Sequence, residues 1–428
     1  MSKILIKNVE LITDGREYAS KYIGIEDTKI AYIGSEEPAG YETAEVIDGS
    51  GKLAAPGMVN THGHAAMSIL RSYADDLALM DWLQNHIWPI EGKMVTPDFY
   101  WGNVLAVAEM LKTGTTCFAD MYFEMEECVK ACMEGGIRAN LSRGLLGGEA
   151  NKDDFRLKEN VELFKAWHGK ADDTIHISLG PHAPYTCSPA YLEFIASTAK
   201  ELGCELQMHL SETQFEVDNC IKEHGLTPIG LAEKCGILEA GCIAAHCVAV
   251  TDADLELMQK YNVRVAHNPQ SNLKLASGVA PVDKMLAKGI LVGIGTDGCS
   301  SNNNLDMLEE TRLVAMLHKG VTKDPVVIPA REAFDMATYQ GAQVLGFKNL
   351  GKLEVGYLAD IVLYDMNKPW WHPRNEKHSL LVYSAQSSDC DTVIVNGKVV
   401  VKKGEVLGLD LEKAYAECDA RAKNLAQK

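Results

Sequence analysis

Long hydrophobic runs and paired cysteines are both missing from this chain of 428 residues. No apolar stretch approaches the 18 or so residues that a membrane-spanning helix needs, so we expect no membrane partner. The N-terminal segment has no long apolar core and no small-residue cleavage site, so it is interpreted as a strand rather than a secretory signal. The 12 cysteines never occur with C-x-x-C spacing, which excludes zinc fingers and the deaminases that hold zinc through a cysteine pair. Reduced thiols in a cytoplasmic protein are the expectation.

Positive charge is also scarce. Lysine and arginine number 41 against 59 aspartates and glutamates, which gives a net charge of −18. Such a chain repels phosphate backbones, so nucleic acid is not an expected partner. The hydrophobic and charged fractions, 46% and 23%, are ordinary for a globular protein. The length indicates one large domain or two smaller ones.

Between residues 56 and 349, short apolar runs alternate with helical patterns. The predicted strands are 58–64, 115–121, 138–144, 176–183, 205–212, 242–249, 264–269 and 291–298. Predicted helices between them include 98–112, 124–135, 157–168, 189–202, 252–261 and 306–318. Eight strands that alternate with helices over ~250 residues predict an α/β fold, a (β/α)8 TIM-like barrel. A doubly wound sheet is the alternative, but its glycine fingerprint after the first strand is replaced here by His-Gly-His.

The two ends of the chain have a different pattern from the middle. Residues 1–55 and 350–428 contain short alternating strands separated by Gly, Asp and Asn, and the segment 410–428 has the pattern of a terminal helix. Neither end has enough strands to bury a sheet face alone. We therefore expect both ends to pair in one small β-sandwich beside the barrel.

Polar residues that suit a metal follow several of the predicted strands. His62 and His64 are two residues apart, so their side chains point to the same side of a strand. This pair alone is a weak signal, because two surface histidines would look the same. His209, His246 and Asp297 end three further strands, and all strand ends of a barrel meet at one mouth. A His/Asp set with room for water suits catalytic Zn²⁺ or Fe²⁺.

These residues can be given separate roles. The predicted metal ligands are His62, His64, His209 and Asp297. A bound metal lowers the pKa of its water, and Glu212, three residues beyond a ligand, could move a proton from that water to a substrate. His246 could orient the water or polarise the substrate; the alternatives are a fourth ligand and an ordinary buried histidine. The predicted catalytic residues are therefore Glu212, His246 and Asp297.

The fourth predicted strand argues for a single metal ion. Two-metal hydrolases on this barrel commonly bridge their metals with a modified lysine at the end of strand 4. The strand here contains no lysine and ends at His182. We expect one divalent metal per chain, zinc before iron, with His182 as a substrate contact. A histidine that only caps the loop is the alternative.

Taken together, these segments resemble the amidohydrolase superfamily. The resemblance rests on PGMVNTHGH, HLSE, AAHC and GTDG in this order, with the later strand GYLADIVLYD. Within the superfamily, the chain resembles the deaminases of 5-methylthioadenosine and S-adenosylhomocysteine. The segments that carry this closer likeness are HGHAAMSILRSYADDLALMDWLQNHIWPIE, NLSRGLL, RLKENVELF, LGPHAPYTCS, HLSETQFEV and GTDGCSSNNNLDM. The resemblance implies hydrolysis of the adenine 6-amino group to an inosine analogue and ammonia, with adenosine and 5′-deoxyadenosine as further substrates.

The same resemblance implies contacts for a purine nucleoside. Glu91 would hold the ribose hydroxyls, although a glutamate at an exposed helix start has the same local sequence. Arg143 and Arg156 would serve the distal end of the substrate, with Arg143 just after the third strand. His182 would contact the purine or sugar side, and Glu212 and Asp297 would face the reacting end. A dimer or tetramer is common among such enzymes.

Other functions on the same scaffold remain open at this point. A guanine, cytosine or triazine deaminase or a chlorohydrolase would share the metal set and differ in the loop after the first strand and in the fourth strand. A catalytically inert scaffold would usually lack metal ligands. A nucleoside-binding sensor would keep Glu91 and the arginines but would gain nothing from Glu212.

Overall fold

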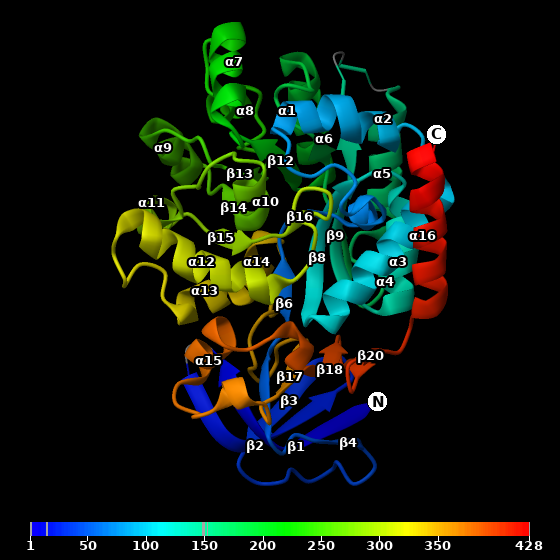
Figure 1. Ribbon diagram of the computed structural model, residues 1–428, viewed down its shortest axis with the longest axis vertical. Helices are drawn as coiled ribbons and strands as arrows, with labels where there is room; N and C mark the ends of the chain where they lie inside the picture. The colour runs from blue at the N-terminus through cyan, green and yellow to red at the C-terminus, as the bar shows by residue number, and fades with distance from the viewer. Residues whose placement is uncertain (1, 14–15, 148–149, 152, 428) are drawn as a thin grey trace.

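The apolar runs in the middle of the chain form a parallel barrel in the computed structural model (Figure 1). The structure describes residues 2–13, 16–147, 150–151 and 153–427. The barrel strands are β6 (Met58–Asn60), β7 (Gly63–His64), β8 (Thr115–Tyr122), β9 (Arg138–Leu145), β10 (Ile175–Ile177), β11 (Gly180–Pro181), β12 (Leu206–Leu210), β13 (Cys242–His246), β14 (Arg264–His267), β15 (Val292–Ile294) and β16 (Asp297–Gly298). Each pairs in parallel with its neighbour, as expected for a (β/α)8 fold.

Two junctions close the ring of strands. Leu179 forms a parallel bridge to Leu206, which joins β10 and β11 to β12. At the other junction, the Thr61 N–H donates to the Ile294 carbonyl at 2.9 Å, and β16 pairs with β7. Three of the eight predicted strands are therefore split in two, because the backbone turns near the mouth to aim polar side chains inward.

Helices cover the outside of the barrel and its mouth. Those around the barrel are α3 (Thr96–Lys112), α4 (Met125–Gly135), α5 (Phe155–Trp167), α6 (Pro189–Leu202), α7 (Gln214–His224), α8 (Pro228–Lys234), α9 (Asp252–Lys260), α10 (Pro269–Lys274), α11 (Val282–Ala287), α12 (Met307–Thr322), α13 (Ala330–Met336) and α14 (Tyr339–Val344). The segment after the first strand forms η1 (Ala65–Leu70), α1 (Leu79–Asp81), η2 (Trp82–Ile87) and α2 (Trp88–Glu91). In Figure 1, α1, α2, α7 and α8 lie at the end of the barrel away from the N-terminus.

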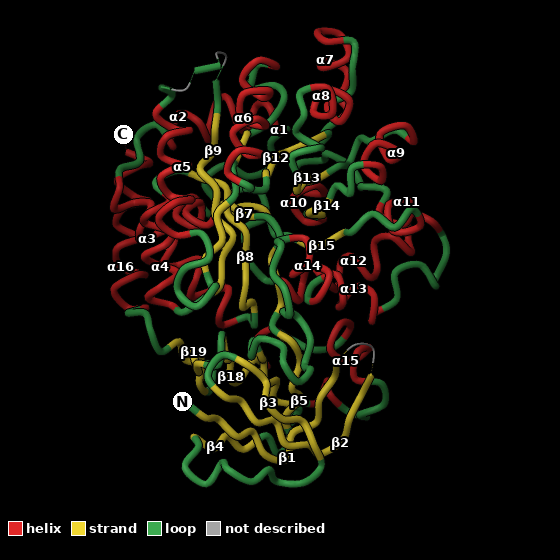
Figure 2. The backbone as a smooth tube through the Cα atoms, turned by 180° about the vertical axis from the view of Figure 1, so that it is seen from behind, coloured by secondary structure: helices red, strands yellow, loops and turns green. Residues whose placement is uncertain are grey.

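The two chain ends pair in one nine-stranded sheet below the barrel (Figure 2). Its strands are β1 (Lys3–Thr13), β2 (Arg16–Glu26), β3 (Lys29–Gly34), β4 (Glu45–Asp48), β5 (Lys52–Pro56), β17 (Ile361–Asp365), β18 (Cys390–Val395), β19 (Lys398–Lys402) and β20 (Glu405–Val406). The central contact between the two ends is the antiparallel pairing of β5 with β17. The strands enclose a separate apolar core that includes Ile6, Leu11, Ile23 and Leu363. Beside the sheet lie η3 (Pro369–Trp371), α15 (Lys377–Tyr383) and η4 (Ser387–Asp389).

A buried ion pair joins the barrel to this sheet. Arg138, at the start of β9, has no exposed side-chain surface, and neither has its partner Asp360. The guanidinium donates from Nε and Nη2 to the Asp360 carboxylate at 3.2 and 3.1 Å, and also to Asn396 Oδ1 and the Asp173 carbonyl. All three nitrogens of the guanidinium are therefore satisfied at the base of the barrel.

The terminal helix α16 (Leu411–Gln427) packs on the barrel rather than on the sheet. It runs beside α3, where Arg421 donates to Asp98 at 3.0 Å and the Cys418 thiol to the Trp101 carbonyl at 3.3 Å (Figure 1). The C-terminal segment thus returns from the sheet to the barrel wall.

Candidate active site

Several strands end at the mouth in an unusual backbone conformation. Ser211, His246, Cys247 and Asp297 have φ values of 53°, 73°, 48° and 61°, in the left-handed region that is unfavourable for residues with a side chain. Ser211 follows β12, His246 and Cys247 end and follow β13, and Asp297 begins β16. Such strain is found where the surrounding structure fixes a functional geometry. Here it turns the polar groups of three strands toward one point.

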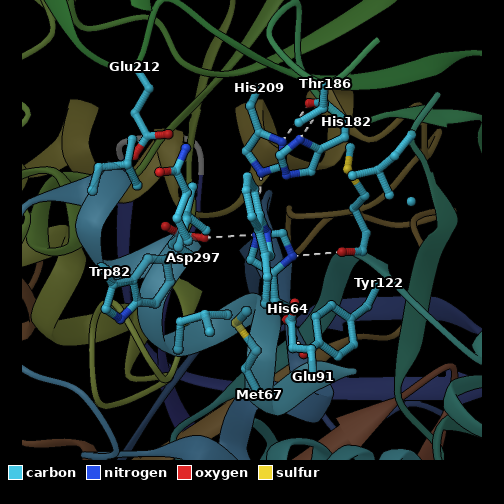
Figure 3. A pocket seen from close by; sticks show the side chains of 18 of the residues that line it. His64, Met67, Trp82, Glu91, Tyr122, His182, Thr186, His209, Glu212 and Asp297 are labelled. Carbon is cyan, nitrogen blue, oxygen red and sulfur yellow. Dashed lines mark hydrogen bonds and ion pairs between the residues drawn. The ribbon is translucent and has the colours of Figure 1, made fainter. Parts of the chain in front are cut away.

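The predicted metal ligands converge at that point, and Figure 3 shows three of them, His64, His209 and Asp297, around one position. His62 Nε2 and His64 Nε2 lie 3.5 and 3.2 Å from Asp297 Oδ1, and His209 Nε2 lies 3.3 Å from His64 Nε2. Ligand atoms of His62, His64 and Asp297 lie within 4.8 Å of one another, and so do those of His62, His209 and His246. The structure therefore brings together all four predicted ligands, with His246 beside them.

Hydrogen bonds on the far side of two rings fix which nitrogen faces the cluster. The Nδ1 atoms of His64 and His209 each lie 2.7 Å from a backbone carbonyl, of Met121 and His182 respectively. A carbonyl only accepts, so each Nδ1 carries a hydrogen, and Nε2 is the nitrogen whose lone pair can face a metal ion once one binds. His62 Nε2 is buried and has no hydrogen-bond partner among the described residues. These groups fit a divalent metal ion, and the cluster is a candidate metal centre.

The charges of the cluster also suit a cation. Burial alone would raise the pKa of Asp297, but the imidazoles of His62 and His64 outweigh burial and hold it well below its usual value. Burial lowers the pKa of His62 and of His209, so these rings stay neutral. For His64, burial is outweighed by Asp297, and the pKa rises to about 9. In this arrangement a proton shared with Asp297 occupies the position that a metal cation would take.

Glu212 lies beside the cluster on the loop that follows β12. Its Oε2 atom is 3.8 Å from His246 Nε2, and both side chains are buried. Burial, then repulsion from Asp297 and Glu216, raises the pKa of Glu212 well above its usual value. A carboxyl group whose pKa is raised by burial can accept a proton and return it, as a general acid and base does.

A cavity of about 510 Å³ opens in front of these groups, and Glu91 lines it. Glu91 ends α2, and its carboxylate accepts a hydrogen bond from the Tyr122 hydroxyl. Burial raises the pKa of Glu91 to about 7 although that hydrogen bond opposes the shift. Glu91 is therefore not at an exposed helix start, which was the alternative that its local sequence allowed.

His182 lies between the metal cluster and the cavity wall. Its Nδ1 atom is 2.8 Å from the Thr186 hydroxyl, and burial, followed by the charges of His64 and His62, lowers its pKa to about 3. The ring is neutral and lines the cavity, together with the apolar side chains of Trp82 and Leu83. The site thus combines polar groups at one end with a wide apolar wall.

The two arginines that the resemblance assigned to the distal end of the substrate are both paired with carboxylates. Arg143 lies within β9, as the predicted strand 138–144 has it, rather than just after that strand, and its Nε donates to Glu159 at 2.9 Å. Arg156 is in the first turn of α5, 3.3 Å from Asp154. Neither arginine is among the described residues that line the cavity. Their guanidinium groups would have to leave these partners to reach a substrate.

Sequence reasoning missed other residues that hold the site. Tyr122 bonds Glu91, Ser271 bonds Asp297, and Asn272 bonds His246. Tyr122 ends a strand, and the Asn-Pro-Gln-Ser-Asn segment directly follows another. This position at strand ends is the sequence signal that could have identified these residues. Which partner each side chain reaches depends on the angles between strands, and no sequence period encodes these angles.

The helices over the described ranges include none that is both long and apolar enough to cross a bilayer. This finding agrees with the absence of long apolar runs in the sequence.

Comparison with known proteins identifies the family. The family model for the amidohydrolase family matches residues 53–400. The 5-methylthioadenosine/S-adenosylhomocysteine deaminase of Dictyoglomus turgidum is 49% identical over 426 residues, which cover 100% of both chains. Among solved structures, a zinc-bound adenosine deaminase from Xanthomonas campestris superposes with a TM-score of 0.94 at 31% identity, covering 100% of this chain and 99% of that one. The zinc complex of atrazine chlorohydrolase from Arthrobacter aurescens gives 0.91 at 26%, covering 98% and 100%. The chain belongs to the amidohydrolase family.

Proposed function

We propose that the protein is a metal-dependent hydrolytic deaminase of 5′-methylthioadenosine and S-adenosylhomocysteine, and of adenosine and 5′-deoxyadenosine as smaller substrates. One observation carries the proposal. One cavity is lined by Glu212, by the cluster residues His64, His209 and Asp297, and by the half-buried Glu91. The full-length likeness to deaminases of these two nucleosides supports the same reading.

The metal would be held by His62, His64, His209 and Asp297. We infer one zinc ion per chain, because two solved relatives contain zinc and because the described strands β10 and β11 carry no bridging lysine. Iron(II) also suits this donor set. The ion supplies one property: it makes water acidic enough to act as a nucleophile near neutral pH.

Hydrolysis then requires proton transfers that this chain can perform. The water oxygen bonds to purine C6, the exocyclic C6–N bond breaks, and the products are the 6-oxo nucleoside and ammonia. Glu212 would take one proton from the water and give it to the ring nitrogen beside C6. Asp297 would accept the second water proton, which would return through Glu212 to the leaving amine, while His246 orients the water. Glu212 is suited to this exchange because burial raises its pKa, which makes the carboxylate a better proton acceptor than an exposed one.

Recognition of the rest of the nucleoside falls to the cavity walls. Glu91 would accept hydrogen bonds from the 2′- and 3′-hydroxyls, since a carboxylate has two oxygens for a vicinal diol. His182 would contact the purine or sugar side. Arg143 and Arg156 would serve the carboxylate of the homocysteine substituent after leaving Glu159 and Asp154.

We also infer that residues 1–55 and 350–428 form a unit that supports the catalytic barrel of residues 56–349, with the terminal helix α16 of this unit packed back on the barrel wall. A purine nucleoside is the small-molecule partner, and a homodimer or homotetramer is the inferred assembly.

A substrate panel tests the function directly. Ammonia release is measured with 5′-methylthioadenosine, S-adenosylhomocysteine, 5′-deoxyadenosine, adenosine, guanine and cytosine, with chloride release from atrazine measured in parallel. We expect the highest kcat/KM for the two thio-nucleosides. Turnover of only guanine, cytosine or atrazine would replace the proposal with the corresponding amidohydrolase activity. No turnover by metal-loaded protein would favour a binding protein.

A further inference from the structure

The seventh barrel strand, β14, ends without any of the predicted site residues, yet the turn that follows it contacts two of them. This turn is the short helix α10, which begins after Asn268. Ser271 and Asn272 are adjacent in it and are both buried. Each reaches a different functional group at the mouth. Ser271 and Asn272 are therefore placed to influence the site although neither is among the described residues that line the cavity.

Asn272 contacts His246 on the side away from the cavity. Its Nδ2 atom lies 2.9 Å from His246 Nδ1, and Asn268 Nδ2 lies 3.4 Å from the same atom. An amide NH₂ group only donates, so His246 Nδ1 must accept. A neutral imidazole with an accepting Nδ1 carries its hydrogen on Nε2. His246 Nε2, 3.8 Å from Glu212, is then a donor.

The hydrogen bond at His246 Nδ1 runs in the opposite direction from those at Nδ1 of the predicted ligands His64 and His209. In His64 and His209, Nδ1 donates to a carbonyl, which leaves Nε2 as the nitrogen that can give a lone pair to a metal. In His246, Nδ1 faces an amide and Nε2 presents a hydrogen. A metal needs a lone pair, whereas water or a substrate atom can accept the hydrogen. The contact thus separates His246 from the ligands although it lies within the same cluster.

Ser271 acts on the other carboxylate of the site. Its hydroxyl donates to Asp297 Oδ2 at 2.6 Å, and the Ser301 hydroxyl lies 3.0 Å from the same oxygen. The opposite oxygen, Oδ1, faces His64 at 3.2 Å. With Oδ2 held by the two hydroxyls, the carboxylate cannot rotate freely. One oxygen remains directed at the position between the imidazoles.

We propose that Asn272 and Ser271 are positioning residues of the α10 turn: Asn272 fixes the Nε2–H tautomer of His246 and so excludes it from the metal, and Ser271 aims Asp297 Oδ1 at the metal. This inference rests on the proposed function only for its consequences in turnover. The tautomer and the metal affinity are properties of the protein without substrate, so failure of the two proposals can be told apart. Such supporting contacts typically change metal affinity or activity by 10–100-fold.

The tautomer of His246 can be read from the parent protein. Long-range ¹H–¹⁵N spectra of histidine-labelled, zinc-loaded protein distinguish the two tautomers, and the His246 signal is the one lost in His246→Asn. We expect hydrogen on Nε2. Hydrogen on Nδ1 would mean that the Asn272 amide faces the ring with its oxygen, and it would overturn the assignment whatever substrates the protein uses.

Substitution of Asn272 tests the consequence. Asn272→Leu removes the donor at similar volume, and we expect kcat to fall about 10–100-fold with the bound metal retained and KM nearly unchanged. Gln270→Ala is the matched control, because Gln270 lies in the same turn and its Nε2 atom has no partner among the described residues. An unchanged kcat in Asn272→Leu, or an equal loss in the control, would contradict the role.

Ser271 is tested by metal affinity. Ser271→Ala should raise the Kd for Zn²⁺ by about tenfold or more, measured by competition with a chromophoric chelator. Ser277→Ala is the control, since its buried hydroxyl has no partner in the described part of the chain. We expect the parent affinity there. An unchanged Kd in Ser271→Ala, with the fold confirmed by its unfolding transition, would overturn this half of the proposal.

Discussion

The base and the mouth of the barrel both bury charged side chains, but they satisfy them differently. At the base, every guanidinium nitrogen of Arg138 has an acceptor, and Asp360 is its principal partner. At the mouth, His62 Nε2 has no hydrogen-bond partner among the described residues, and the closest ion-pair partner of Glu212 is 3.8 Å away. A fully paired buried cluster holds a fold together, whereas an incompletely paired one has capacity for a ligand.

Removing the cation at the base should have the largest effect. Arg138→Met leaves Asp360 buried without its partner, so we expect the free energy of unfolding to fall by about 3–5 kcal/mol. Denaturant unfolding measures this change. Lys284→Met, which breaks an exposed ion pair with Asp252, should change stability by no more than about 1 kcal/mol. Similar small losses in both variants would show that the base does not depend on its ion pair.

Removing the carboxylate of Glu212 at the mouth should lower turnover rather than stability. Glu212→Gln should keep the metal and the stability, because it removes a buried carboxylate that lacks a close partner. We expect kcat to fall at least ~10²-fold, the usual scale for a lost general acid and base. Glu223→Gln, on the exposed side of α7, is the control. Near-normal kcat would rule out the proton-transfer role, provided metal analysis shows the ion still bound.

Substitution of Glu91 tests whether the cavity wall recognises the ribose hydroxyls. Glu91→Ala should weaken kcat/KM for adenosine far more than for its 2′,3′-dideoxy analogue, since hydrogen bonds to a charged group contribute roughly 1.5–3 kcal/mol. For each nucleoside, kcat/KM of the parent is divided by kcat/KM of Glu91→Ala, and the two ratios are compared. Equal losses for both nucleosides would mean that Glu91 supports only the local fold.

The smallest effect concerns the distal end of the substrate. Arg156→Met should lower kcat/KM for S-adenosylhomocysteine about tenfold, or about 1.4 kcal/mol, and change 5′-methylthioadenosine little. Higher salt should weaken the charged substrate more than the neutral one in the parent. A parallel fall for both substrates, or for neither, would leave Arg156 as a surface partner of Asp154.

The sequence was most informative where a pattern repeats. The period of apolar runs predicted all eight barrel positions, and the polar residues at their ends led to the metal cluster. Helix α7 was missed because its 11 residues are mostly polar, although Thr213 and Glu216 form the spacing of a helix start.

The supporting contacts of the site could not be predicted in the same way. Asn272 follows a predicted strand, but its approach to His246 depends on how β13 and β14 are turned at the mouth. The same holds for Tyr122 and Glu91, which come from a strand and from the segment that covers the cavity. Sequence spacing places residues at an end of the barrel; side-chain direction decides which of them meet.

Removing the metal and adding it back tests the central claim that the active site at the barrel mouth requires a bound metal ion. The protein is stripped with a chelator, then titrated with Zn²⁺ while ammonia release from 5′-methylthioadenosine and metal content are measured together. We predict a folded, inactive metal-free protein whose activity rises linearly and stops at one equivalent per chain. Full activity without metal would contradict the account, and activity that rises to two equivalents would contradict the single-metal site.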